Sequence, residues 1–290
     1  MSQAAPPSPL PPPSTSIPLP QLRGLGETTR KDAWWMQPLL TFLGLGAFIV
    51  YSTWAALQAE HYFVPNTNYL SPMYSPVIFD APGQVSGHAW FGPWPSWLMW
   101  LPAILLSPAV LILWAPGGFR FTCYYYRGAY YKAFWGDPPS CSVGEPGFRK
   151  KAYRGENSFP LIIQNVHRYF LYLALAFLVL LSYDAVVSYI FPAEGGGKRF
   201  GVHVGSLILT INPILLGGYT FGCHSLRHLV GGRHDCLTDC SATRSGAYRG
   251  VSCLNRRHML FAWMSLFWVG FTDAYVRLVS MGVWTDLRII

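Results

Sequence analysis

The chain has 290 residues, a mass of 32.5 kDa and a formal net charge of +8. Charged residues make up 12%, about half of the ~25% usual in soluble proteins, whereas apolar residues make up 51% and aromatic residues 16%. Abundant, clustered apolar residues exclude a wholly disordered chain, and six cysteines are too few for a small disulfide scaffold. Most of the chain is therefore expected to lie in a lipid bilayer.

Residues 1–32 are expected to form a separate segment. Eight of the first twenty residues are proline, mixed with serine and alanine. This composition predicts a disordered or polyproline tail, and no apolar core of a signal peptide precedes the first span. Residues 33–290 are expected to form one membrane anchor domain.

Five segments are long and apolar enough to cross a bilayer as a helix, which takes about 20 residues. We therefore predict an all-α membrane domain with five transmembrane helices, at residues 34–59, 94–114, 159–191, 202–226 and 258–283. Pro116-Gly117-Gly118 predicts the end of the second span, and Pro213 predicts a kink in the fourth, because proline removes a backbone hydrogen bond. In the last span Asp273 and Arg277 have the i, i+4 spacing of a pair, whereas Asp184 suits either a proton relay or the membrane interface.

Lysine and arginine fall mostly on one side of these spans. The N-terminal tail has three, the segment between the second and third spans has seven, and the segment between the fourth and fifth spans has six. The other side has only Lys198, Arg199 and Arg288. The positive-inside rule therefore predicts a cytoplasmic N-terminus and a C-terminus outside. Juxtamembrane positions also explain the net charge without a nucleic-acid partner.

Cysteine and histidine, which can bind soft metal ions, also lie mostly on one side of the predicted spans. All six cysteines lie on the predicted cytoplasmic side, at Cys123, Cys141, Cys223, Cys236, Cys240 and Cys253. Five histidines lie near the inner ends of the spans: His167, His224, His228, His234 and His258. A reducing compartment disfavours disulfides, so these thiols are either free or available to a metal. Thiolate and imidazole suit zinc, or an iron–sulfur cluster in which two histidines replace two cysteines on one iron.

Haem b is an alternative cofactor. Ligation by two histidines needs both at similar depth on facing helices, which His167 offers with either His224 or His228. The outer half has only His203, so the pattern allows a single inner haem and disfavours two stacked haems.

A non-redox membrane protein is a further alternative. Cys236, Cys240 and His234 could form a structural zinc site in an inner loop of a transporter or a structural protein. The sequence lacks two similar halves with broken helices, which argues against the common transporter plans.

An aromatic and basic stretch runs from Phe121 to Trp135. It is typical of a membrane interface, but it could also form a docking surface for a cytoplasmic partner or the wall of a quinone site. Tyrosine and tryptophan can stack and donate hydrogen bonds, and arginine can stabilise the negative charge of a reduced quinone. The candidate quinone-binding residues are Tyr126, Arg127, Tyr131, Trp135 and Arg227.

Several short stretches, in their order along the chain, resemble a known family. They include Arg120-Phe-Thr-Cys-Tyr-Tyr-Tyr-Arg127, Pro138-Pro-Ser-Cys141, Phe159-Pro-Leu-Ile-Ile-Gln-Asn-Val-His167-Arg-Tyr-Phe170, Gly222-Cys-His-Ser-Leu-Arg-His228 and Arg257-His258-Met259. With smaller matches they cover most of residues 95–285. The chain resembles the membrane-anchor subunit of actinobacterial-type succinate dehydrogenase, respiratory complex II.

The resemblance implies a multi-pass subunit of a bacterial plasma membrane that docks a flavoprotein subunit and an iron–sulfur subunit. It would pass electrons from succinate to quinone near the cytoplasmic face, and would not act on succinate alone. In the subgroup that the chain is most similar to, the resemblance implies a Rieske-type [2Fe-2S] cluster in place of haem. The ligand candidates in the matching stretches are Cys123, Cys141, Cys223, His167, His224, His228 and His258. The resemblance does not decide which two of these cysteines and which two of these histidines bind the cluster.

Overall fold

The computed structural model of the chain describes residues 32–33, 35–134, 161–193, 197–232 and 242–290. The predicted N-terminal tail lies almost entirely outside the described residues. So do five residues that the sequence singled out: Trp135, Cys141, His234, Cys236 and Cys240.

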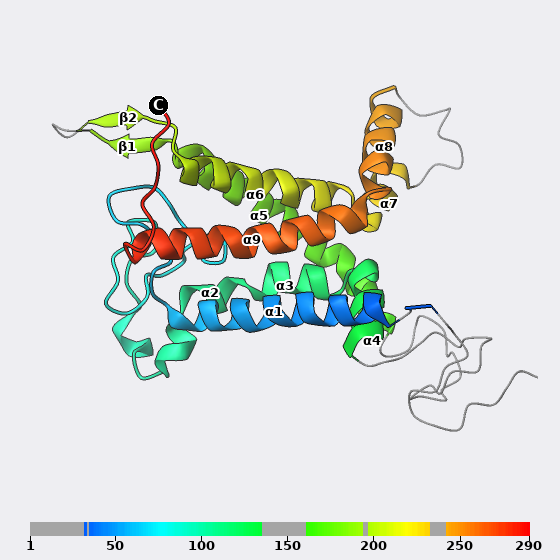
Figure 1. Cartoon of the computed structure of the whole chain (residues 1–290), viewed down its shortest axis with the longest axis horizontal. Coiled ribbons are helices and arrows are strands. Elements are labelled where there is room, and N and C mark those ends of the chain that lie inside the picture. Colours follow the sequence, from blue (N-terminus) through cyan, green and yellow to red (C-terminus); the bar gives the residue numbers. More distant parts are fainter. Residues whose placement is uncertain (1–31, 34, 135–160, 194–196, 233–241) are drawn as a thin grey trace, which may run out of the picture.

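Four of the described helices are long and apolar enough to span a bilayer. They are α1 (Met36–Gln58), α5 (His167–Val187, preceded by the 3₁₀-helix η3, Leu161–Val166), α6 (Val204–Phe221) and α9 (His258–Ser280). Each lies within a predicted span, so four of the five predicted spans are confirmed as helices. In the bundle α6 packs against α5 and α9 and runs antiparallel to both, and α1 packs against α9 (Figure 1).

The predicted second span is wrong as a single helix. Its region forms η1 (Ser96–Leu98), η2 (Ala103–Leu106), α2 (Pro108–Ile112) and α3 (Trp114–Phe121). The first three pieces each begin at or directly after a proline, because proline suits a helix start but lacks the N–H needed inside a helix. The stop expected at Pro116-Gly117-Gly118 is also wrong, since α3 runs through these residues and the Gly117 N–H donates to the Leu113 carbonyl at 2.9 Å.

The prediction of an all-α domain needs a second correction, because the third span ends early. Helix α5 ends at Val187, and β1 (Ile190–Pro192) then pairs antiparallel with β2 (Lys198–Phe200), with Ile190 opposite Phe200. The sequence between the strands contains three consecutive glycines, which favour a turn over a continued helix.

The fourth span is shorter than predicted at its inner end. Helix α6 passes through Pro213 but stops at Phe221, and α7 (His224–Gly231) starts after a break at Gly222 and Cys223. A Cβ at position 222 would lie 2.8 Å from the Gly218 carbonyl oxygen, so glycine permits the close turn there. Helix α8 (Ala242–Asn255) packs against α7 and leads into α9.

Residues 60–93, here called the cap, form an ordered structure over the far end of the bundle (Figure 1). Its core contains the fully buried rings of Tyr62, Tyr69 and Tyr74, and the rings of Tyr62 and Tyr74 stack at 4.5 Å. The Tyr74 hydroxyl donates to the Ala55 carbonyl at 2.6 Å, which ties the cap to α1. Burial raises the pKa of all three phenols, so they remain protonated donors.

Two serines of the cap are bound to carboxylates of the spans. Ser71 donates to Asp273 of α9, and Ser75 donates to Asp184 of α5. The expected pairing of Asp273 with Arg277 is confirmed, with 3.5 Å between Arg277 Nε and the carboxylate and both side chains buried. These bonds fix the cap on the bundle.

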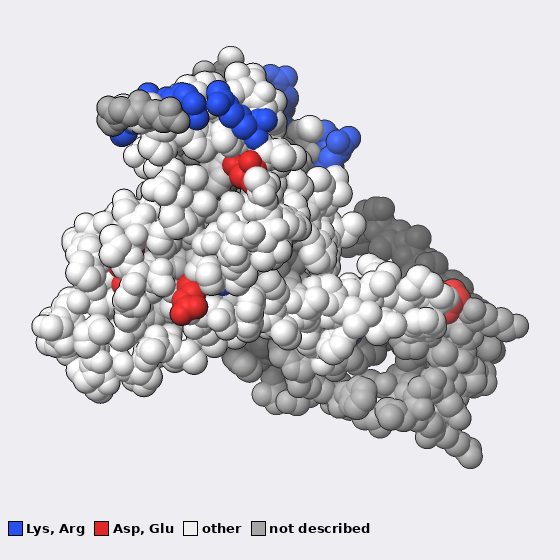
Figure 2. All heavy atoms as spheres, turned by 60° about the vertical axis from the view of Figure 1, so that its left-hand side comes forward, with Lys and Arg blue, Asp and Glu red and all other residues white. Residues whose placement is uncertain are grey.

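The two ends of the bundle differ in character. The basic end consists of α4 (Tyr124–Phe134), α7 and α8, and the cap end consists of the cap, the β1–β2 hairpin and the C-terminal residues (Figure 1). Figure 2, turned toward the cap end, shows a surface with few charged atoms in which Lys and Arg gather at the top. On the side of the bundle, α1 exposes apolar side chains such as Leu40, Leu43 and Val50, which suits contact with a bilayer.

Candidate metal centre and membrane cavity

Two cysteines lie at equivalent breaks between helices. Cys123 follows α3 and precedes α4, and Cys223 follows α6 and precedes α7. At each break the cysteine N–H donates to the carbonyl three residues before it, and the cysteine carbonyl accepts from the arginine four residues after it. The two segments, Phe121–Arg127 and Phe221–Arg227, share the pattern F-x-C-x-x-x-R. The same local turn therefore buries a thiol twice at the basic end.

Two histidines face these thiols. His167 is the first residue of α5, and its Nε2 lies 3.1 Å from Cys223 Sγ. His258 is the first residue of α9, and its Nε2 lies 3.6 Å from Cys123 Sγ. Both thiols and the His167 ring are buried. We call these four residues the Cys–His centre.

The ring of His167 has a defined orientation. Thr122 Oγ1 donates to the Gly118 carbonyl at 2.7 Å and lies 2.9 Å from His167 Nδ1. A hydroxyl has one proton, so Thr122 accepts the second bond and Nδ1 carries the imidazole proton. The lone pair of Nε2 then points toward Cys223 and is free to bind a metal.

Aromatic rings cover both imidazoles. Phe119 stacks on His167 with 4.6 Å between ring centres, and Tyr219 stacks on His258 with 4.8 Å. The guanidinium of Arg120 lies 4.8 Å from the centre of the Tyr219 ring. These rings separate the Cys–His centre from the middle of the bundle.

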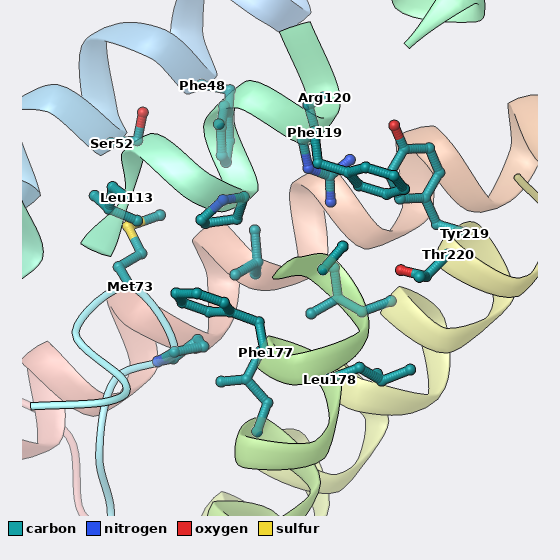
Figure 3. Close-up of a pocket in the computed structure, with 17 residues that line it drawn as sticks. Phe48, Ser52, Met73, Leu113, Phe119, Arg120, Phe177, Leu178, Tyr219 and Thr220 are labelled. Atoms are coloured by element: carbon teal, nitrogen blue, oxygen red, sulfur yellow. The ribbon is translucent and has the colours of Figure 1, made fainter. Parts of the chain in front are cut away.

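A cavity of about 190 Å³ lies beyond these rings, between α1, α3, α5, α6, α9 and the cap. Figure 3 shows Phe48, Leu113, Phe177 and Leu178 around it, with Phe119, Arg120, Tyr219 and Thr220 grouped on one side. The lining is apolar apart from a few polar groups, as is usual for sites that bind apolar ligands.

Comparison with known proteins identifies the family. The model of the actinobacterial succinate dehydrogenase subunit SdhC matches residues 36–282. The chain belongs to this family. A solved structure, the Mycobacterium smegmatis Sdh1 complex in the apo form, contains a chain 42% identical to this one, with a TM-score of 0.78 over 93% of this chain and 97% of that chain. No curated protein matches the chain.

The family assignment confirms the resemblance seen in the sequence. The chain is a multi-pass membrane protein, the membrane anchor, and it forms a succinate dehydrogenase complex with other subunits. The route of electrons and the cofactor are separate questions, which depend on the residues of the Cys–His centre.

In this chain, four of the seven candidate ligands lie together in the Cys–His centre: Cys123, Cys223, His167 and His258. His224 and His228 lie apart from the centre on α7, with their Nε2 atoms 2.9 Å from each other at an exposed position. Partial burial, His228 and Arg227 together lower the pKa of His224. Cys141 lies outside the described residues.

The candidate quinone residues do not form one site in the described part of the chain. Tyr126 is buried and its hydroxyl donates to the Ala262 carbonyl at 2.7 Å, and burial raises the pKa of this phenol to about 12. Arg127 lies over the ring of Tyr124, and Arg227 donates to the Tyr248 hydroxyl at 2.9 Å. Trp135 lies outside the described residues, and Tyr131 stacks on its neighbour Tyr130.

The cavity and Arg120 were missed by the sequence reasoning. Arg120 stands in a family-like stretch, but nothing in the sequence shows that its side chain reaches α9. In the structure it donates to the Ser265 hydroxyl at 2.9 Å and to the Ala262 carbonyl at 3.2 Å. The F-x-C-x-x-x-R pattern was a signal that could have selected Cys123 and Cys223 among the six cysteines.

Proposed function

We propose that the chain docks the flavoprotein and iron–sulfur subunits of succinate dehydrogenase and passes their electrons to quinone, and that Cys123, Cys223, His167 and His258 hold a Rieske-type [2Fe-2S] cluster. The observation that carries this proposal is the pairing of two buried thiols with two imidazoles, of which His167 is buried and His258 is half-buried, each pair joining different helices. When bound, such a cluster accepts and releases one electron at a time.

The residues of the Cys–His centre fit this cluster in number and type. A Rieske-type cluster takes two cysteines on one iron and two histidines on the other. Its ligands are spread over two irons, so they need not converge on one point. Among the described residues, no three His, Cys, Asp or Glu side chains form a site for a single metal ion. A mononuclear zinc site at the Cys–His centre would need such convergence.

The surroundings of the Cys–His centre suit a redox group. Thr122 fixes the orientation and tautomer of His167, as partners of metal-binding histidines commonly do. His258 Nδ1 is buried beside the backbone of Tyr219. Phe119 and Tyr219 exclude water from one side of the centre.

The basic end suits docking of water-soluble subunits. Phe121 and Tyr124 are exposed there, next to Arg127 and Lys132 on α4. Exposed aromatic residues with arginine are enriched in protein–protein interfaces. A partner seated there would lie close to the Cys–His centre, since Cys123 directly precedes α4.

Electron paramagnetic resonance and optical spectra of the purified complex test the cofactor. We expect a reduced Rieske-type signal without haem bands, and its loss in His258→Ala and in His167→Ala. His224→Ala is the matched control, since this exposed histidine lies outside the Cys–His centre, and it should keep the signal. Unchanged succinate oxidation with a soluble dye would show that the variant complexes are assembled.

Three results would contradict the proposal. Haem bands in place of the signal would favour a single-haem anchor, and a signal that survives in His258→Ala would remove this residue from the ligand set. Zinc in the complex, with neither the Rieske-type signal nor haem bands, would favour the structural zinc alternative.

A further inference from the structure

We propose that residues 94–106, here called the aromatic shelf, lie in the head-group layer of the bilayer at the cap end and bind lipid there. The shelf contains the 3₁₀-helices η1 and η2 and connects the cap to α2. This inference concerns the membrane surface alone and is independent of the proposed redox function.

The shelf is an uncharged segment with an apolar surface. The sequence has no Lys, Arg, Asp or Glu between Asp80 and Arg120. Trp97 is 71% exposed and Trp100 is 78% exposed. Other large apolar side chains are exposed around them, on the shelf or at the adjoining edge of the cap: Trp90, Phe91, Met99, Ile104 and Leu105. A cluster of exposed apolar side chains marks a surface that contacts a partner or a membrane.

Contacts with α1 place the shelf at the end of a transmembrane helix. Helix α1 has 23 residues and is about 35 Å long, enough to cross a hydrocarbon core of about 30 Å. Ser107, directly after the shelf, donates to the carbonyl of Ala56 in the last turn of α1, and η2 packs against α1. The shelf therefore lies at the level where α1 leaves the hydrocarbon core. In Figure 1 the segment before α2 extends sideways at this end of α1.

The backbone of the shelf suits the head-group layer better than the hydrocarbon core. Two single turns are closed by hydrogen bonds from Leu98 to the Pro95 carbonyl at 2.9 Å and from Leu105 to the Pro102 carbonyl at 2.9 Å. Short turns divided by proline do not pair their polar groups as a continuous helix does. Irregular backbone exposed to lipid does not occur in the hydrocarbon core, whereas head groups and water supply partners for it.

The side chains of the shelf favour lipid over a protein partner. Tryptophan is enriched at the head-group level, because its ring is apolar and its N–H can donate to head groups or water. A protein interface would instead be expected to have a polar rim around an apolar centre. Helix α1, which η2 contacts, also exposes apolar side chains such as Val50 and Trp54, so the apolar surface of the shelf continues that of a transmembrane helix.

The test measures the surroundings of a nitroxide spin label on the shelf. The label is attached at Trp97→Cys and at Trp100→Cys in the whole complex in lipid nanodiscs, and the spectrum of the wild type, treated in the same way, is subtracted. Val50→Cys on α1 is the matched lipid control, since Val50 is 71% exposed, as Trp97 is. Val85→Cys in the cap, where Val85 is 84% exposed, is the water control. Relaxation of each label is measured with oxygen, which concentrates in lipid, and with a water-soluble nickel chelate.

We expect both shelf labels to be relaxed more by oxygen and less by nickel than the label at position 85, with values closer to those at position 50. Unchanged succinate oxidation with a soluble dye would show that the variant complexes are assembled. A shelf label that behaves like the one at position 85 would overturn the inference, because the shelf would then be a loop in water. Protection from both reagents would also overturn it, because a protein chain would then cover the shelf.

Discussion

Thr122 is the residue that links the Cys–His centre to the backbone of α3. Its hydroxyl bonds to the Gly118 carbonyl and to His167 Nδ1, and the residue is buried. Gly118, four residues before Thr122, allows close packing, because a Cβ there would lie 2.2 Å from the ring of Phe170 on α5 and this ring would have to move. A glycine and a threonine in one helical turn thus bring α3 close to α5 and orient its first residue.

We predict that Thr122→Val weakens cofactor binding without changing the fold. Valine keeps the shape of threonine but leaves the His167 N–H without its acceptor, and loss of such a partner costs about 10–100-fold in metal affinity. Iron content and the paramagnetic signal after a chelator challenge measure the effect. Thr272→Val is the control, since this buried hydroxyl makes the same bond within its helix to Trp268, far from the centre. Equal iron retention in both variants would exclude a role of Thr122 in orienting His167.

A buried ion pair joins α9 to α1 and the cap. Asp273 accepts from Tyr51 at 2.6 Å and from Ser71, while Arg277 donates to the carbonyls of Glu60 and Ala55. Both charged groups are almost fully buried, so each depends on the other and on these bonds. The pair is one of the contacts that hold the cap on the bundle.

We predict that Arg277→Met lowers the thermal stability of the complex more than the double variant Asp273→Asn, Arg277→Met. The single change leaves an uncompensated buried carboxylate, which costs about 3–5 kcal/mol in proteins of known stability, whereas the double change leaves none. Melting temperatures in one detergent, with the wild type alongside, measure the difference. A single variant as stable as the wild type would mean that the pair contributes nothing to holding these elements together.

Hydropathy predicted the helices that lie uninterrupted in the bilayer and failed where proline divides the chain. In the second span, a new short helix starts at or directly after each of Pro95, Pro102 and Pro108. The mean hydropathy of the segment does not reveal these breaks. The sequence did not predict the cap, because this segment has the composition of an ordinary polar loop. Its tyrosines are buried and hydrogen-bonded only in the folded structure.

The sequence predicted the membrane depth of the candidate metal ligands, but not which of them lie together. The positions of cysteine and histidine relative to the predicted spans placed the candidates on one side of the membrane. Which of them come into contact depends on where each residue lies around its helix axis and on which helices pack together. His224 and His228 share a helix face and lie 2.9 Å from each other at an exposed position, whereas His167 and His258 begin two different helices and lie against the buried thiols. The position of the cavity depends on packing of five helices and could not be derived from the sequence.

At the scale of the whole molecule, charge and thiols are sorted between the two ends. The basic end carries Arg127, Lys132, Arg227, Arg244 and Arg249, whereas the cap end carries Lys198, Arg199 and Arg288 (Figure 1). In the sequence, five of the six cysteines precede, follow or lie between the helices of the basic end, and Cys253 lies on α8. If the positive-inside rule orients this protein, all of its thiols face the cytoplasm.

We predict that a membrane-impermeant maleimide leaves the wild-type chain unlabelled in intact cells and labels it after the membrane is permeabilised. Cys253 on α8 is exposed, so it can react once the reagent reaches that side. Val85→Cys places a thiol in the cap, where Val85 is 84% exposed, and this variant should be labelled in intact cells. A cytosolic protein with an exposed cysteine is the control for cell integrity. Labelling of the wild type in intact cells, with no additional labelling in Val85→Cys, would reverse the orientation and would place the proposed docking surface for the soluble subunits on the wrong side of the membrane.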